Sequence, residues 1–140
     1  MRNRPSAEIL LVRKDGALIL QHRDNKPNIV RPDVVTTFGG TIEEGEAPVE
    51  AAYREINEET NLNLKVEDLE FFGKYERSIE VDEEENDLYC FVVRDVDDSS
   101  LEIYEGQRFE IAKSLEEVEI LNSAPFLVRI AKDYFDIHSL

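Results

Sequence analysis

Hydrophobic residues along this chain fall mainly into short runs, which is the pattern of β-strands. Nearly continuous apolar runs cover residues 7–13, 17–22, 34–38 and 88–93. A further run, residues 69–75, alternates and predicts a strand that buries Leu69, Phe71, Gly73 and Tyr75 on one face. We also expect a short strand at 101–104. The turn signal at 14–16 predicts that the first two strands form a hairpin.

Residues 48–60 contain no helix breaker and predict a helix. Pro48 suits its first turn, and Ala47 before it is expected to be a weak N-cap. Asn61 follows at the position where a left-handed residue commonly ends a helix. The residues expected to face the core recur at helical spacing, and they are Val49, Ala52, Tyr53 and Ile56.

Two more helices are predicted near the end of the chain. Ser114 and Glu117 form a capping box that opens a short helix. A second helix begins near Pro125, and its apolar stripe (Leu127, Ile130, Ala131, Tyr134) is expected to pack on the sheet. The order strand, strand, short strand, helix, strands, helix, helix predicts an α/β fold with a mixed sheet and helices on both faces. With 140 residues, we expect a single domain over 1–140.

The charge balance narrows the classes of partner. There are 32 acidic and 16 basic residues, a formal net charge of −16, which disfavours nucleic acid and anionic membranes. A phosphate-rich ligand would therefore need cations beside it. The chain has one cysteine, Cys90, which we expect in the core and which fits a reducing cytoplasm. No apolar run is long enough for a signal peptide or a membrane span.

Acidic side chains are concentrated on the predicted helix 48–60. Glu55, Glu58 and Glu59 are spaced i, i+3, i+4 and share one stripe. Each such pair repels by roughly 3 kcal/mol at an effective dielectric constant near 20, and a bound Mg²⁺ would reverse the sign. The alternative is a solvated acidic face. A second acidic run, 80–87, is expected to be a solvated hairpin loop, with cation recruitment as the lesser alternative.

Residues 40–62 resemble the Nudix box, the pattern G-x5-E-x7-R-E-U-x-E-E-x-G-U in which U is a bulky aliphatic residue. The matching positions are Gly40, Glu46, Arg54, Glu55, Ile56, Glu58, Glu59 and Leu62. Asn61 departs from the pattern, which has glycine there; both residue types tolerate positive φ. The resemblance implies a Nudix-type α/β/α sandwich with a mixed sheet.

The resemblance also implies the composition of a catalytic metal site. Glu55, Glu58 and Glu59 would hold Mg²⁺, or Mn²⁺, with the Gly39 carbonyl oxygen and Glu105 completing the ligands. Glu105 lies in a Glu-Gly-Gln sequence similar to one in Nudix enzymes that hydrolyse nucleoside triphosphates. Arg54 would complete the catalytic group by pairing with Glu46 or Glu55 and fixing the ligand geometry. The base stays open among Glu55, Glu58 and Glu105.

Three residues are candidates for substrate binding. Gly40 opens the box, and Arg23 lies where many Nudix proteins place a basic residue near the substrate phosphates; a plain surface arginine is the alternative. Asn122 resembles, by position, an asparagine that reads the purine base in oxidised-guanine-nucleotide hydrolases, although Asn is also an ordinary helix-start residue. His22, next to Arg23, is interpreted as a strand-end residue rather than a ligand.

The function implied is a metal-dependent pyrophosphohydrolase. It would cleave the diphosphate link of a nucleoside diphosphate joined to another group, in a nucleoside triphosphate, an oxidised nucleotide or a nucleotide sugar. The alternative is a Nudix-like regulatory module that binds a nucleotide without chemistry, but such modules usually lose box glutamates, and all are present here. The small-molecule nucleotide is the expected partner, and a homodimer stays open.

Overall fold

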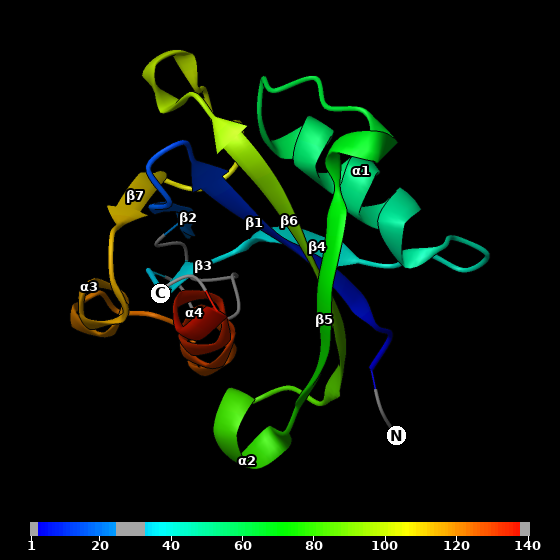
Figure 1. Ribbon diagram of the computed structural model, residues 1–140. Helices are drawn as coiled ribbons and strands as arrows, with labels where there is room; N and C mark the ends of the chain where they lie inside the picture. The colour runs from blue at the N-terminus through cyan, green and yellow to red at the C-terminus, as the bar shows by residue number, and fades with distance from the viewer. Residues whose placement is uncertain (1–2, 25–32, 138–140) are drawn as a thin grey trace.

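The computed structural model describes residues 3–24 and 33–137, which form a seven-stranded sheet with helices on both faces (Figure 1). The strands are β1 (Ser6–Arg13), β2 (Leu18–His22), β3 (Val35–Thr36), β4 (Phe38–Thr41), β5 (Glu70–Arg77), β6 (Asn86–Val96) and β7 (Arg108–Ala112). Their order is β3-β2-β1-β6-β5, with β4 paired to β1 and β7 paired to β2. β1 and β6 are parallel and the other pairs are antiparallel, so the mixed sheet is confirmed.

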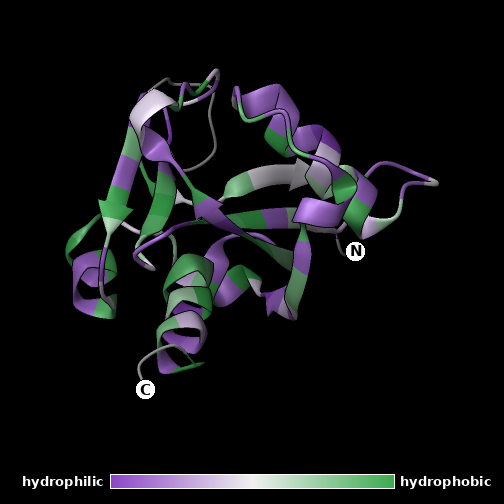
Figure 2. Ribbon diagram, turned by 45° about the horizontal axis from the view of Figure 1, so that its top comes forward, coloured by the Kyte–Doolittle hydropathy of each residue, from purple (hydrophilic) through white to green (hydrophobic). Residues whose placement is uncertain are grey.

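The helices lie on opposite faces of the sheet, which confirms the α/β/α arrangement. α1 (Pro48–Glu59) covers one face, and α3 (Leu115–Ile120) and α4 (Pro125–Ile137) cover the other. A short α2 (Ile79–Asp82) follows β5, and 3-10 turns occupy Val66–Asp68 and Asp98–Ser100. Figure 2 shows α1 mostly hydrophilic and α4, near the C-terminus, with more hydrophobic residues. None of the helices in the described ranges is long and apolar enough to cross a bilayer.

Strand β1 supplies both cores because its side chains alternate. Ile9 and Leu11 pack in the core under α1, whereas Leu10 and Val12 pack in the core under α4. On the α4-facing side of β1, the residue before Leu10 is Glu8, so the row changes from apolar to acidic at this position. Cys90 of β6 is fully buried in the same core, as the sequence predicted.

Residues 35–41 join the two halves of the sheet. β3 pairs with β2 at Gln21 and His22, and β4 pairs with β1 at residues 6–9. The chain therefore passes from one strand to the other where β1 and β2 diverge. This path delivers Gly39 and Gly40 to the start of the box.

The strand expected at 101–104 is wrong. Ile103 forms only an isolated bridge with Thr60, and the strand in this part of the chain is β7, at Arg108–Ala112. β7 pairs along the whole of β2, whereas in the described part of the chain residues 101–104 bond to residues 59–61, at the end of α1, and to none of the seven strands. Whether a segment forms a strand depends on finding a sheet edge to pair with, and the local sequence pattern does not contain that information.

The predicted burial along β5 is correct for Leu69 and Tyr75 but wrong for Phe71. A bulge between Phe71 and Gly73 shifts the alternation, so Phe71 is 56% exposed and Phe72 packs against the core under α4. On α1, Ala52 and Ile56 are buried as predicted, but Tyr53 is 39% exposed and Ala51 is buried instead.

Asn61 does not adopt the left-handed conformation expected of it. Among the described residues, the positive φ in this turn belongs to Asn63, and α1 ends at Thr60 in an extended conformation. The Asn61 side chain donates to the Ser100 carbonyl (3.0 Å) and accepts from the Glu102 N–H (2.8 Å). Its amide therefore anchors the segment that leads to Glu105.

The acidic run 80–87 joins the antiparallel strands β5 and β6, as the predicted hairpin requires, but it is not solvated throughout. Asp82 ends α2 and is almost fully buried, where its carboxylate pairs with Arg129 of α4 at 3.2 Å. Asn86, at the start of β6, is also buried. A buried carboxylate requires a cationic or hydrogen-bonding partner, so this segment is part of the packing of α2 against α4.

Candidate active site

The two glycines at the end of β4 bring the box helix close to the sheet. Gly39 has φ of 148°, and a Cβ there would collide with the Ala7 carbonyl oxygen. A Cβ on Gly40 would lie 2.6 Å from Cδ of Glu55. Only a residue without a side chain allows the Glu55 carboxylate to lie against β4.

Arg54 holds the loop and the helix together, with the pairing expected from the sequence. It donates through Nε to Glu46 Oε2 at 2.9 Å and through Nη2 to Glu46 Oε1 at 3.0 Å, which is a bidentate ion pair. Its Nη1 donates to Glu55 Oε1 at 2.8 Å, and Nη2 also donates to the Thr41 carbonyl. The Arg54 guanidinium lowers the pKa of Glu46 to about 2. These contacts occupy the Arg54 guanidinium and hold the Glu55 carboxylate in place.

Glu59 is a buried carboxyl group without adequate partners. It is 2% exposed, and its Oε1 accepts from the Gly39 N–H at 3.3 Å. Its Oε2 has no hydrogen-bond partner among the described residues. Burial raises the pKa of Glu59 far above its usual range, and the adjoining Glu55 carboxyl and the charge of Glu105 raise it further. Such a group keeps a proton unless a cation replaces it.

The third box carboxylate is more exposed than the other two. The Glu58 side chain is 61% exposed and lies 3.6 Å from Nη1 of Arg54. Within residues 3–24 and 33–137, no three His, Cys, Asp or Glu side chains form a ready-made cation site. Glu55 and Glu59 are together, Glu105 approaches them, and Glu58 would reach them by turning its exposed side chain.

The loop that carries Glu105 is fixed across the end of β2. Gly106 has φ of 95°, and a Cβ there would lie 2.8 Å from the His22 carbonyl oxygen. That oxygen accepts from the Gln107 N–H at 2.8 Å, and the Gln21 side chain donates to the Glu105 carbonyl at 3.1 Å. These contacts explain why Gly and Gln follow Glu105.

Arg23 lies beside this loop. It lines a small cavity of about 80 Å³ together with Gly39 and Glu105. Its Nε is buried and, in the described part of the chain, has no hydrogen-bond partner. An unpaired guanidinium N–H next to a carboxylate cluster can hydrogen-bond to a phosphate oxygen.

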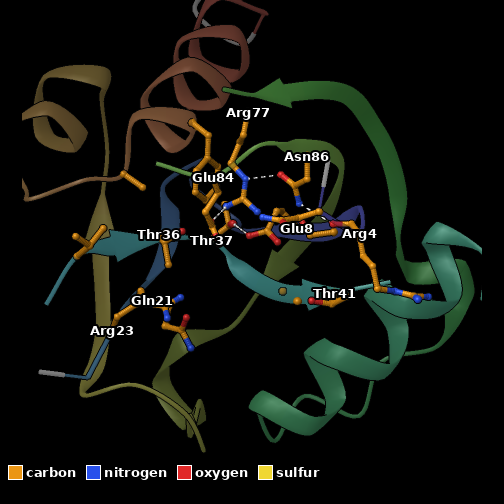
Figure 3. A pocket seen from close by; sticks show the side chains of 17 residues that line it. Arg4, Glu8, Gln21, Arg23, Thr36, Thr37, Thr41, Arg77, Glu84 and Asn86 are labelled. Atoms are coloured by element: carbon orange, nitrogen blue, oxygen red, sulfur yellow. Dashed lines mark hydrogen bonds and ion pairs between the residues drawn. The ribbon is translucent and has the colours of Figure 1, made fainter. Parts of the chain in front are cut away.

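A larger cavity of about 440 Å³ lies on the α4 side and shares Arg23, Gly39 and Gly40 with the carboxylate site (Figure 3). Its most unusual residue is Glu8, which is 7% exposed and was not among the predicted site residues. Glu8 Oε1 accepts from the Thr37 hydroxyl at 2.6 Å, and burial raises the pKa of Glu8 to about 7. The available signal was a glutamate inside an otherwise apolar strand.

Two neighbouring residues are placed outside these cavities. Asn122 is exposed, its side chain donates to the Asp33 carbonyl at 3.2 Å, and it lines neither cavity. His22 ends β2 as predicted, with Nε2 2.6 Å from Asp33 and Nδ1 3.3 Å from Glu110. In this conformation Asn122 fastens the start of the last helix to the loop before β3, and its role in substrate binding stays a prediction.

Comparison with known proteins gives a consistent result. A NUDIX-domain family model matches residues 2–134. The structure is similar to MutT protein from Methanosarcina mazei Go1 (TM-score 0.74, 16% identity, 99% of this chain and 97% of that one). It is similar to a binary complex of the C. elegans Ap4A hydrolase (TM-score 0.74, 15% identity, 98% of each chain).

A third similar structure contains a metal ion. It is the bifunctional NMN adenylyltransferase/ADP ribose pyrophosphatase from Francisella tularensis, complexed with AMP and a Mn ion (TM-score 0.73, 16% identity). The match covers 98% of this chain and 42% of that one. At these identities the three structures share the fold, and the family model spans nearly the whole sequence, including the box that the glycines and Arg54 hold against the sheet. This chain belongs to the Nudix family.

Proposed function

We propose that this Nudix hydrolase is a metal-dependent pyrophosphohydrolase acting on a nucleoside diphosphate joined to another group. The observation that carries the proposal is Glu59, a buried carboxyl with an unpartnered oxygen beside Glu55 and near Glu105. Burying such a group without a function would cost several kcal/mol in order of magnitude. The unpartnered oxygen would be a ligand for a divalent cation, whose charge would offset the repulsion among the carboxylates.

The residues present fit a hard divalent cation. Glu55, Glu58, Glu59 and Glu105 would hold Mg²⁺, or Mn²⁺, with the Gly39 carbonyl oxygen, because all of these ligands are oxygens. When bound, the ion would neutralise phosphate charge and lower the pKa of the attacking water.

The chain's own residues would act by positioning. Arg54 holds the Glu55 carboxylate in place, and Glu46 in turn fixes Arg54 through two hydrogen bonds. Arg23, with its unpartnered Nε, would bind the substrate phosphates. A proton from the attacking water would pass to a carboxylate, with Glu55, Glu58 and Glu105 as the candidates. In phosphoryl transfer, such positioning and charge stabilisation supply most of the rate.

Two features support a nucleotide as the substrate. The large cavity adjoins the carboxylate site through Gly39 and Gly40, so a phosphate chain at the carboxylates would lead into it. The similar proteins named above include hydrolases of Ap4A and ADP ribose, both of which contain a nucleoside diphosphate joined to another group.

The proposal is tested with a panel of nucleotides, incubated with Mg²⁺ and analysed by mass. The panel contains nucleoside triphosphates, oxidised triphosphates, nucleotide sugars and dinucleoside polyphosphates. We expect cleavage of a diphosphate link, and no cleavage when a chelator is present. Failure to cleave any member, with a nucleotide still bound, would favour the regulatory-module alternative.

A pair of variants tests the assignment of the carboxylates. Glu58→Gln should lower turnover by orders of magnitude and leave the fold unchanged, because the side chain is 61% exposed and the change conserves its shape. Glu119→Gln, an equivalent change on the exposed face of α3, should have no effect. Normal turnover by Glu58→Gln would show that the metal assignment is wrong.

A further inference from the structure

The large cavity is lined by a charged residue of the sheet, Glu8. On the α4-facing row of β1, Leu10 and Val12 are core residues, but Glu8, which precedes them on the same side, lines the cavity together with Phe126 at the start of α4. β6 repeats the pattern, because Leu88 and Cys90 are core residues and Asn86 lines the cavity. Towards the N-terminal ends of these two parallel strands, polar residues therefore replace apolar ones, at Glu8 in β1 and further on, beyond Leu88, at Asn86 in β6. The cavity is thus a polar recess rather than a gap in the core.

Glu8 is fixed in this recess and faces its interior (Figure 3). The Thr37 hydroxyl donates to Oε1 at 2.6 Å. The other oxygen, Oε2, lies 2.7 Å from the position that a Cβ on Gly39 would occupy, so it is next to the glycine that borders the carboxylate site. Above its raised pKa of about 7 the Glu8 carboxylate accepts about four hydrogen bonds; the Thr37 hydroxyl donates one, and the Ser6 hydroxyl is near enough to donate a second. Glu8 therefore has acceptor capacity for a ligand.

The cationic neighbour of Glu8 is already engaged. Arg77 donates through Nε to the Asn86 side chain at 2.7 Å and pairs through Nη1 with Glu84 at 2.9 Å. Its guanidinium also lies 5.1 Å from the centre of the Phe126 ring. Arg77 thus contributes positive charge and, stacked on Phe126, part of the cavity lining. Glu8 supplies hydrogen-bond acceptors for a group that enters the cavity.

From this arrangement we infer that Glu8 determines which base the enzyme accepts, by taking hydrogen bonds from adjacent N–H groups on the base edge. This rests on the proposed function for the phosphate end of the substrate. Among the common bases, guanine presents two neighbouring donors, N1–H and the N2 amino group, which match the two oxygens of one carboxylate. Adenine and cytosine each place one donor next to an acceptor, and that acceptor would lie against an oxygen of Glu8 and be repelled by it. The cavity volume of about 440 Å³ is in the range of small-ligand sites.

The test measures binding without hydrolysis. Dissociation constants of GMP, IMP and AMP are determined by calorimetry for the full chain, Glu8→Gln and the control Glu70→Gln, which changes an exposed glutamate of β5. IMP differs from GMP only by the missing amino group. We expect wild type to bind GMP at least about tenfold more tightly than IMP or AMP, because a site built to pair a donor rejects the analogue that lacks it.

The variants decide whether Glu8 is responsible. Glu8→Gln should abolish most of the preference for GMP over IMP, because the amide presents a donor in place of one acceptor, and Glu70→Gln should retain it. Equal binding of GMP and IMP by wild type, or an unchanged preference in folded Glu8→Gln, would overturn the inference. The wild-type comparison decides the point even if the variant does not fold. A failure of hydrolysis with the preference intact would instead contradict the proposed function.

Discussion

The close contact between Gly40 and Glu55 leads to a sharp prediction for Gly40→Ala. A Cβ at this position would lie 2.6 Å from Cδ of Glu55, whereas carbon atoms in contact are about 3.5–4.0 Å apart. The Glu55 carboxyl must therefore retreat by about 1 Å, or β4 must shift. Gly40 does not have a positive φ, so the alanine backbone itself is unstrained.

The expected cost appears in catalysis more than in stability. Overpacking costs about 1–3 kcal/mol, and the carboxyl group is the end of a flexible side chain, so we expect a loss of folding free energy near the lower figure. A misplacement of about 1 Å in a catalytic constellation can lower the rate roughly 100-fold. Turnover and its dependence on Mg²⁺ concentration, measured with thermal unfolding, separate the two effects.

Gly45→Ala is the matched control. Gly45 has φ of 83°, but a Cβ there would meet nothing within 4 Å. The substitution should cost about 1–2 kcal/mol through backbone strain and leave the Glu55 carboxylate in place. Full activity of Gly40→Ala, or equal loss of activity in both variants, would refute the argument that the glycine serves the carboxylate.

Three further changes test other parts of the structure. Glu46→Gln should lower kcat by about 10-fold or more because Arg54 loses the bidentate partner that fixes Glu55, whereas a kcat within twofold of wild type would count against this role. Burial raises the pKa of Glu8 from 4.5 to about 7, so this residue should contribute a loss of about 2–3 kcal/mol in the free energy of unfolding between pH 5 and pH 8, because the unfolded chain ionises first. Urea titrations should show that Glu8→Gln loses less stability than wild type over this range by that amount, and parallel pH profiles would disprove the assignment. Asn61→Gly, which restores the family pattern, should destabilise the protein by about 1–2 kcal/mol by removing two hydrogen bonds, and a rise in Tm would contradict this.

The box and the helix that carries it could be predicted because they depend on residues that are close together in the sequence. Pro48 begins α1, Ala52 and Ile56 are buried, and Arg54 makes the expected pairs with Glu46 and Glu55. Helical spacing and a charged motif determine these features without reference to distant residues. The family model and the similar folds then confirm the membership that the motif suggested.

Features that depend on distant partners could not be predicted in this way. β7 forms because β2 offers an edge, and the bulge in β5 exchanges the burial of Phe71 and Phe72. Asparagine is common where helices end, yet the Asn61 side-chain amide hydrogen-bonds to residues about forty positions away in the sequence. Glu8 acquires its character from Thr37 and the end of α4, which only the fold brings to it.

Whether the buried carboxyl of Glu59 helps to bind a divalent cation can be measured on the free protein. Mn²⁺ titrations followed by electron paramagnetic resonance compare wild type with Glu59→Gln, and Glu119→Gln corrects for weak binding to the acidic surface. We expect specific binding to wild type and to Glu119→Gln, and at least about tenfold weaker binding to Glu59→Gln. Identical titrations for all three proteins would show that the buried carboxylate of Glu59 does not serve a metal ion.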